Sequence, residues 1–211
     1  MFDAQWIFQI LPDLLSALMV NVQITVFGYL IALVVGLLIA MARRVPFFGA
    51  VLHAVTEFIR TTPLIVQAVF VFLLTPAFIS PLTVGIVVIG VHYSAYTAEV
   101  YRSGIEGVAK GQWEAARALS LPARRTWGAI VLPQAIRKVI PALGNYLIAT
   151  FKDTPLLIAI GVGEVLTVAR QIGSASFRVV EVYTIVGFLF LLVTIPSAII
   201  LRRLERRYAA V

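Results

Sequence analysis

The sequence contains no cysteine and few charged residues, and both absences limit what the chain can be. Without cysteine it can form neither disulfides nor thiolate metal sites. Only 13% of the 211 residues are Asp, Glu, Lys or Arg, whereas 61% are hydrophobic. At a mean hydropathy of +0.98, a soluble domain would expose large apolar patches. The composition therefore predicts an integral membrane protein.

The sequence also lacks the motifs of an enzyme that acts alone. It has no G-x-x-x-x-G-K-[ST] loop, so we do not expect it to bind and hydrolyse ATP itself. We find no paired-carboxylate, Ser/His or metal-ligand spacing and expect no cofactor in this chain. His53 and His92 are isolated and are interpreted as packing or interface residues. The first residues, MFDAQWIFQ, lack the basic stretch of a cleavable signal peptide, so the first apolar helix is expected to be retained.

Continuous apolar runs favour membrane helices over a β-barrel, whose strands would alternate. A spanning helix needs about 20 apolar residues, and the chain has room for about five. We therefore predict an all-α integral membrane protein with one domain over residues 1–211. The expected spans cover residues 15–42, 51–74, 82–101, 136–152 and 183–201. The fourth is short and breaks at Lys152-Asp153-Thr154-Pro155, and such breaks line cavities rather than face lipid.

The net charge of +7 lies in three groups of basic residues rather than in a nucleic-acid-binding face. All but Lys152, Arg170 and Arg178 of the 17 fall near residues 43–60, 102–138 and 202–207. By the positive-inside rule these regions face the cytoplasm. With five spans, the C-terminus is then cytoplasmic and the N-terminus outside, and the stretch before Arg43 has no Lys or Arg.

Several residues inside the spans are unusual for lipid-facing positions. Gly28, Ala32 and Gly36 form a small-residue face suited to close helix packing. Arg60 next to Pro63 is costly in lipid, so it is either functional or a snorkelling side chain. On a helix, Tyr93, Tyr96 and Val100 share one face, with Glu99 three residues after Tyr96.

A basic, Ala-rich segment interrupts the apolar runs and reads EAARALSLPARRTWGAIVLP from Glu114 to Pro133. A short helix over residues 112–121 would place Glu114 near its N-terminus, where a carboxylate is favoured. Ala115, Ala116 and Ala118 would give a smooth surface for a partner's groove. From composition alone, an amphipathic helix lying on lipid headgroups explains the segment as well.

This segment resembles the EAA loop of ATP-binding-cassette (ABC) importer permeases: EAA, three residues, Gly, nine residues, Ile, one residue and Leu-Pro. Glu114, Ala115, Ala116, Ile130, Leu132 and Pro133 match in register, and Ser120 stands where the family usually has Gly. Gly adopts a left-handed conformation easily, and Ser does so at a modest cost. FIRTTPLIVQ (58–67), AYTAEVYRSGIEGVAKGQWEAARAL (95–119) and LPQAIRKVIPALGNYLIATFKDTPLLIAIGV (132–162) are similar to the polar amino-acid branch.

The resemblance implies a type I importer in the bacterial cytoplasmic membrane. This chain would pair with a second permease subunit, identical or paralogous, two cytoplasmic ATPases that bind ATP and Mg, and an extracytoplasmic binding protein. The segment around residues 112–121 would be a cytoplasmic coupling helix that docks on the ATPase. Its cargo would be an amino acid or an amino-acid derivative, with no role for nucleic acid.

Substrate contacts are expected at the polar positions of neighbouring spans. Asp153 would accept the ammonium of a zwitterion, and a half-helix beginning near Leu156 and Leu157 would bind its carboxylate. The other candidates are Thr61, Thr62, Gln67, Glu99 and Thr154. Alternatively, Lys152 and Asp153 only solvate a helix end. Two other functions stay open: a secondary carrier or membrane enzyme that uses Glu99 and Asp153 to handle protons, and a membrane scaffold that transports nothing.

Overall fold

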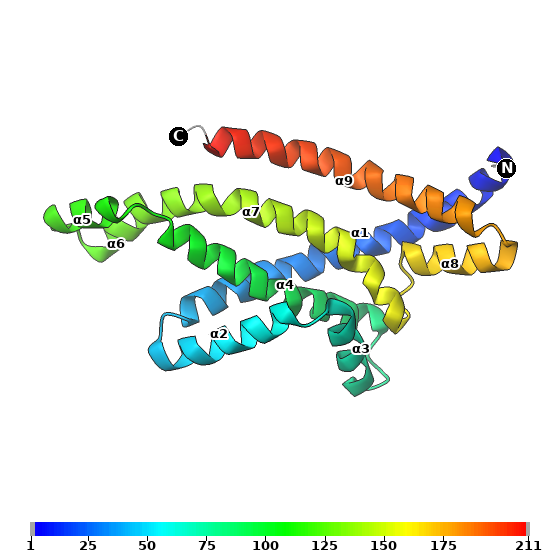
Figure 1. Cartoon of the computed structure of the whole chain (residues 1–211), viewed down its shortest axis with the longest axis horizontal. Helices are drawn as coiled ribbons and strands as arrows, with labels where there is room; N and C mark the ends of the chain where they lie inside the picture. Colours follow the sequence, from blue (N-terminus) through cyan, green and yellow to red (C-terminus); the bar gives the residue numbers. More distant parts are fainter. Residues whose placement is uncertain (1–2, 210–211) are drawn as a thin grey trace.

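The computed structural model describes the backbone of residues 3–209, which is helical apart from short connections (Figure 1). The elements in chain order are α1 (Ala4–Ala42), α2 (Pro46–Thr61), α3 (Leu64–Leu74), α4 (Pro81–Glu106), α5 (Lys110–Ala118), α6 (Ala123–Arg125), the π-helical η1 (Thr126–Val131), α7 (Leu132–Asp153), the 3₁₀-helical η2 (Thr154–Ile160), α8 (Val165–Ser176) and α9 (Val179–Ala209). The all-α fold class predicted from the sequence is confirmed.

Three helices, α1, α4 and α9, are long and apolar enough to cross a membrane by themselves. Two bent pairs raise the number to at most five: α2 with α3, bent by 106°, and the stretch from Ala123 to Ile160 with α8, bent by 55°. The expected span over residues 51–74 is therefore not one helix. Thr62 is extended, because the proline that follows it disfavours the helical conformation, and Pro63 has no N–H for a helical hydrogen bond.

The core forms where α1 packs against α4. A methyl group added to Gly28 would lie 2.9 Å from Ile89, and one added to Gly36 would lie 2.9 Å from the Ser94 carbonyl oxygen. The Thr97 hydroxyl donates across this contact to the Ala32 carbonyl, at 2.7 Å. The small-residue face predicted on the first span thus lets the two helices approach at van der Waals distance.

The fourth span differs from the prediction in its length and in its end. α7 covers Leu132–Asp153 and continues without a turn into η2, so no free helix N-terminus lies near Leu156 and Leu157. The chain turns only at Gly161, whose φ is +76°. The next helix begins at Val165, and the side chain of Glu164 caps it. The expected carboxylate site on a half-helix at Leu156 and Leu157 is therefore wrong.

The basic groups gather at one end of the molecule. The α1–α2 turn, α5 with α6, and the end of α9 all lie toward the left of Figure 1, while α8 and the start of α1 lie at the opposite end. Arg60, which the sequence analysis assigned to the basic group of residues 43–60, does not lie at this end. It lies 14 residues into α2, about 20 Å along the helix from Pro46, and it points into the interior instead.

Candidate functional site

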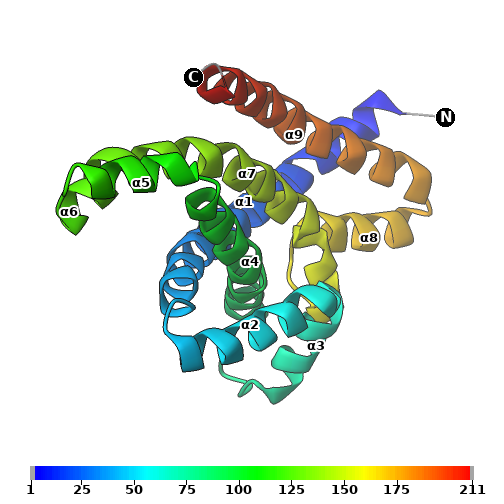
Figure 2. The same ribbon diagram turned by 60° about the vertical axis from the view of Figure 1, so that its left-hand side comes forward.

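The Ala-rich segment forms the short helix α5, at the tip of an arm that projects beyond the other helices (Figure 2). It ends in a Schellman motif, because the Ser120 N–H donates to Arg117 O at 2.9 Å and the Leu121 N–H donates to Ala116 O at 3.0 Å. Ser120 has a φ of +49°. The left-handed conformation expected at this position is confirmed, and a serine adopts it where glycine would do so without steric cost.

The two faces of α5 differ. Ala116 is 2% exposed and packs against the protein itself, whereas Glu114, Ala115, Ala118 and Leu119 are exposed. The expected surface of three alanines is therefore reduced to two, and Leu119, 72% exposed, adds an apolar side chain to it. Because α5 begins at Lys110, Glu114 lies in the second turn. The sequence placed Glu114 near the start of a helix over residues 112–121, but the helix begins two residues earlier and its first turn has no acidic residue.

The later motif residues connect α5 to the membrane helices. Ile130 lies in η1, and its carbonyl accepts a hydrogen bond from Gln134 Nε2 at 2.9 Å. Leu132 and Pro133 begin α7, which continues directly from η1, and Pro133 has no N–H to donate to the preceding turn. The motif thus spans an exposed helix, a π-helical turn and the start of a long helix.

Aromatic and charged side chains meet between α4 and α7. Tyr93 donates its hydroxyl to Asp153 Oδ2 at 2.6 Å. The rings of Tyr96 and Tyr146 lie 5.4 Å apart between centroids, and the Arg60 guanidinium lies 5.5 Å from the centre of the Tyr96 ring. Asp153 therefore points inward to α4 and does not merely solvate a helix end. The proximity of Tyr93 and Tyr96 follows the spacing seen in the sequence.

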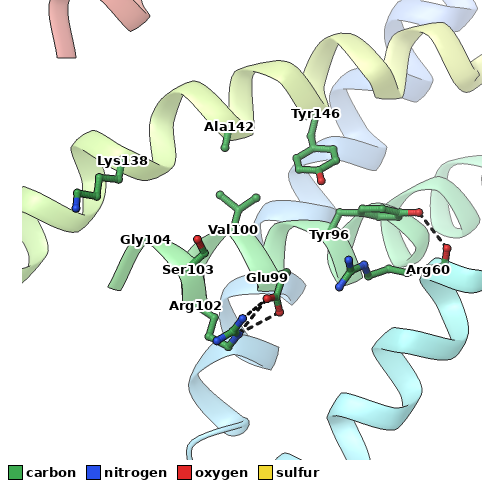
Figure 3. A pocket seen from close by; sticks show the side chains of 10 residues that line it. All are labelled: Arg60, Tyr96, Glu99, Val100, Arg102, Ser103, Gly104, Lys138, Ala142 and Tyr146. Carbon is green, nitrogen blue, oxygen red and sulfur yellow. Dashed lines mark hydrogen bonds and ion pairs between the residues drawn. The ribbon is translucent and has the colours of Figure 1, made fainter. Parts of the chain in front are cut away.

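A cavity of about 280 Å³ opens beside these rings. Figure 3 shows Tyr96 and Tyr146 at one side of it with Arg60 beneath, Glu99 between Arg60 and Arg102, and Lys138 at the opposite side. The Arg60 Nε atom is buried and has no hydrogen-bond partner among the described residues. The guanidinium also forms an ion pair with Glu57 through one Nη atom, at 2.9 Å. The cavity thus combines aromatic faces, which attract cations, with a guanidinium group that is only partly paired.

The other predicted polar residues divide into two groups. Gln67 donates to the Thr62 hydroxyl at 2.6 Å, and its Oε1 lies 3.0 Å from His92 Nδ1, so the break between α2 and α3 is tied to α4. His92, interpreted from the sequence as an isolated packing residue, is part of this network. Thr61 instead donates to its own helix at Glu57 O and is exposed.

Glu99 does not share a partner with Asp153. Its carboxylate accepts from Arg43 at 3.2 Å and forms an ion pair with Arg102, which also pairs with Glu106. A carboxylate held by two arginines is poorly suited to exchange protons at neutral pH. This arrangement gives no support to a proton-handling pair of Glu99 and Asp153.

A buried polar cluster that the sequence analysis did not identify connects α1 to both ends of the η2 segment. Asn21 Nδ2 donates to Thr154 Oγ1 at 2.8 Å and to Glu164 Oε2 at 3.2 Å, and its Oδ1 accepts from the Val165 N–H at 3.0 Å. Asn21, Thr154 and Glu164 are fully buried. Thr154 thus lies in this cluster and away from the cavity. The sequence did contain a signal for this cluster: Asn21 and Glu164 lie within apolar runs, and polar side chains in a membrane need hydrogen-bond partners.

These features define a class of protein: a helical, multi-pass membrane protein with an internal polar cavity and a protruding helix-loop segment, as expected of a transport component. Within the described residues, no group of three His, Asp or Glu side chains could hold a metal ion. The chain belongs to the family of binding-protein-dependent transport system inner membrane components, which it matches over residues 32–210.

Known proteins resemble the chain over nearly its full length. It is 40% identical to the probable amino-acid ABC transporter permease protein y4tG of Sinorhizobium fredii, over 92% of this chain and 86% of the relative. It is 37% identical to the glutamine transport system permease protein GlnP of Escherichia coli, over 98% and 97%. A crystal structure of an amino acid ABC transporter with histidines superposes with a TM-score of 0.92 at 30% identity, covering 98% of this chain and 99% of that chain.

Proposed function

We propose that this chain is the permease subunit of an ABC importer for polar amino acids or their derivatives. The observation that carries the proposal is α5, a protruding helix with a small exposed face and a Schellman end at Ser120. Buried surface against another protein would compensate for exposing Leu119 to water. The face formed by Glu114, Ala115, Ala118 and Leu119 is therefore the docking surface for a separate ATPase, which supplies the ATP and Mg that this chain does not bind.

The internal cavity is the substrate path in this proposal. The faces of Tyr96 and Tyr146 in the cavity attract the ammonium of an amino acid by cation–π contact. Asp153, bonded to Tyr93 beyond these lining residues, is the carboxylate that accepts it. The Arg60 guanidinium, which pairs with Glu57 through one Nη atom and leaves Nε without a partner, is the donor for the carboxylate. Arg60 thus replaces the half-helix that the sequence suggested for this role. The relatives' names, which include glutamine and other amino acids, agree with a zwitterionic cargo.

The remaining partners and the location follow from the family. A second permease subunit, identical or paralogous, completes the membrane part, and an extracytoplasmic binding protein delivers the substrate. The chain is placed in the bacterial cytoplasmic membrane with its basic end, including α5, in the cytoplasm. This orientation obeys the positive-inside rule and puts α5 where ATP is available.

A charge reversal on the docking face tests the function. We expect Glu114→Lys to abolish both uptake and substrate-stimulated ATP hydrolysis in the reconstituted complex, because Glu114 is exposed and its change leaves the fold intact. Arg203→Gln, on the exposed end of α9, is the matched control for a change in surface charge. If the Glu114→Lys complex assembles and transports normally, α5 is not the docking helix. Uptake without any copurifying ATPase would favour a secondary carrier instead.

A further inference from the structure

α5 packs on the rest of the protein through a small apolar cluster that includes two aromatic rings. Its main packing partner is η1. The rings of Trp113 on α5 and Trp127 on η1 lie 5.2 Å apart at 78°, an edge-to-face arrangement. Both rings pack on a buried cluster formed by Val108, Val131 and Ala135. Because these contacts are close-packed, α5 and η1 form one unit.

Trp127 also contacts the end of α1. The guanidinium carbon of Arg44, in the turn after α1, lies 4.5 Å from the centre of the Trp127 ring, within cation–π range. The preceding Arg43 turns the other way, toward Glu99 on α4 at 3.2 Å and His53 on α2 at 2.6 Å. The two neighbouring arginines thus tie the end of α1 to different elements, one of which is the unit that carries α5.

The backbone at Trp127 differs from the helices on either side. Residues 126–131 are π-helical, a geometry that occurs mostly as short insertions at functional sites. The Trp127 ring contacts both Trp113 of α5 and Arg44 in the turn after α1.

We propose that Trp127 is the joint through which a displacement of α5 reaches the end of α1, with Arg44 and Trp113 as its two contacts. The proposal rests on the proposed function, in which the ATPase moves α5. Trp127 is a positioning residue, because it touches neither the cargo nor the nucleotide. When α5 moves, the turn after α1 and the start of α2 move with it.

The absence of cysteine makes a direct distance measurement simple. Val45→Cys and Gln112→Cys, both exposed positions, place spin labels on the turn before α2 and on α5. In the complete complex, we expect the label-to-label distance to be the same without nucleotide and after trapping with ATP and vanadate. If the label-to-label distance in the wild-type complex differs between the two states, Trp127 does not transmit the displacement of α5 to the end of α1.

Substitutions at Trp127 and Arg44 should allow the two labels to move independently of each other. Arg44→Gln removes the cation and leaves the buried cluster intact, and Trp127→Leu removes the ring while keeping apolar volume. In both, we expect the distance to differ between the two states and substrate-stimulated ATP hydrolysis to fall about fivefold, as for a typical coupling between sites. Trp127→Phe keeps an aromatic face and should behave as wild type, as should Arg203→Gln.

The outcomes distinguish the joint from the function on which it rests. Suppose that the wild-type complex couples transport to ATP hydrolysis, and that Arg44→Gln and Trp127→Leu show the same hydrolysis and the same constant label-to-label distance. This result would contradict the proposed role of Trp127 and leave the proposed function standing. Failure of the wild-type chain to assemble with any ATPase overturns the proposed function and the joint together.

Discussion

Replacing Asn21 by leucine tests the buried polar cluster, and the structure sets the size of the effect. Leucine would leave the Val165 N–H without an acceptor, at about 1–3 kcal/mol, and remove a donor from the Glu164 carboxylate, at about 1.5–3 kcal/mol. The Thr154 hydroxyl would keep its bond to Phe151 O and add little. We therefore expect a loss of about 3–5 kcal/mol, because groups buried in a membrane protein find no water to replace the lost partner.

Thermal unfolding in detergent, followed by circular dichroism, measures this loss. For a chain of this length, it corresponds to a fall in melting temperature of about 10 °C. Asn145→Leu makes the same chemical change at an exposed position of α7, where Asn145 contacts Glu205, and should shift stability by about 0.5 kcal/mol or less. Equal shifts for the two variants would refute the reasoning, since they would show that Asn21 is not needed to satisfy buried groups.

Three further substitutions test separate parts of the structure. Asp153→Asn keeps an acceptor but removes the negative charge, so uptake of zwitterionic or cationic amino acids into vesicles should fall. The control Asp13→Asn should leave uptake unchanged. Normal uptake kinetics for Asp153→Asn would show that this carboxylate is not part of the substrate path. Ser120→Gly should raise stability by up to about 1 kcal/mol, because glycine adopts a positive φ without steric cost, and a lower melting temperature would contradict this. Gly36→Val should prevent the close approach of α1 and α4 and lower the melting temperature more than Gly187→Val, at which an added Cβ meets nothing within 4 Å; equal effects would argue against the packing.

The Ala-rich segment from Glu114 to Pro133 shows how far sequence patterns reach. A local motif fixes local geometry, so the register of residues 114–133 predicted a short helix, its end near Ser120 and the positive φ there. It did not predict which face of that helix is exposed, because Ala115 and Ala116 have the same chemistry. Only the packing of α5 on η1 buries Ala116 and leaves Ala115 open.

The interior site was less predictable. Asp153 and Tyr93 were both candidates by type or spacing, but their contact joins residues 60 positions apart. The role of Asn21 joins α1 to residues more than 130 positions later. Such pairs depend on how helices are arranged, and helix periodicity contains no information about which faces of distant helices meet.

The sequence by itself determined that this is an all-helical membrane protein with a short, exposed Ala-rich helix, because composition, apolar run length and a local motif act through nearest neighbours along the chain. The tertiary structure decided what the polar residues do. It placed Arg60 at the aromatic cavity, Asp153 against the Tyr93 hydroxyl, and Glu99 between two arginines. It also buried Glu164 under Asn21. These assignments depend on long-range packing, in which a charged group is stable only beside a partner that another helix supplies.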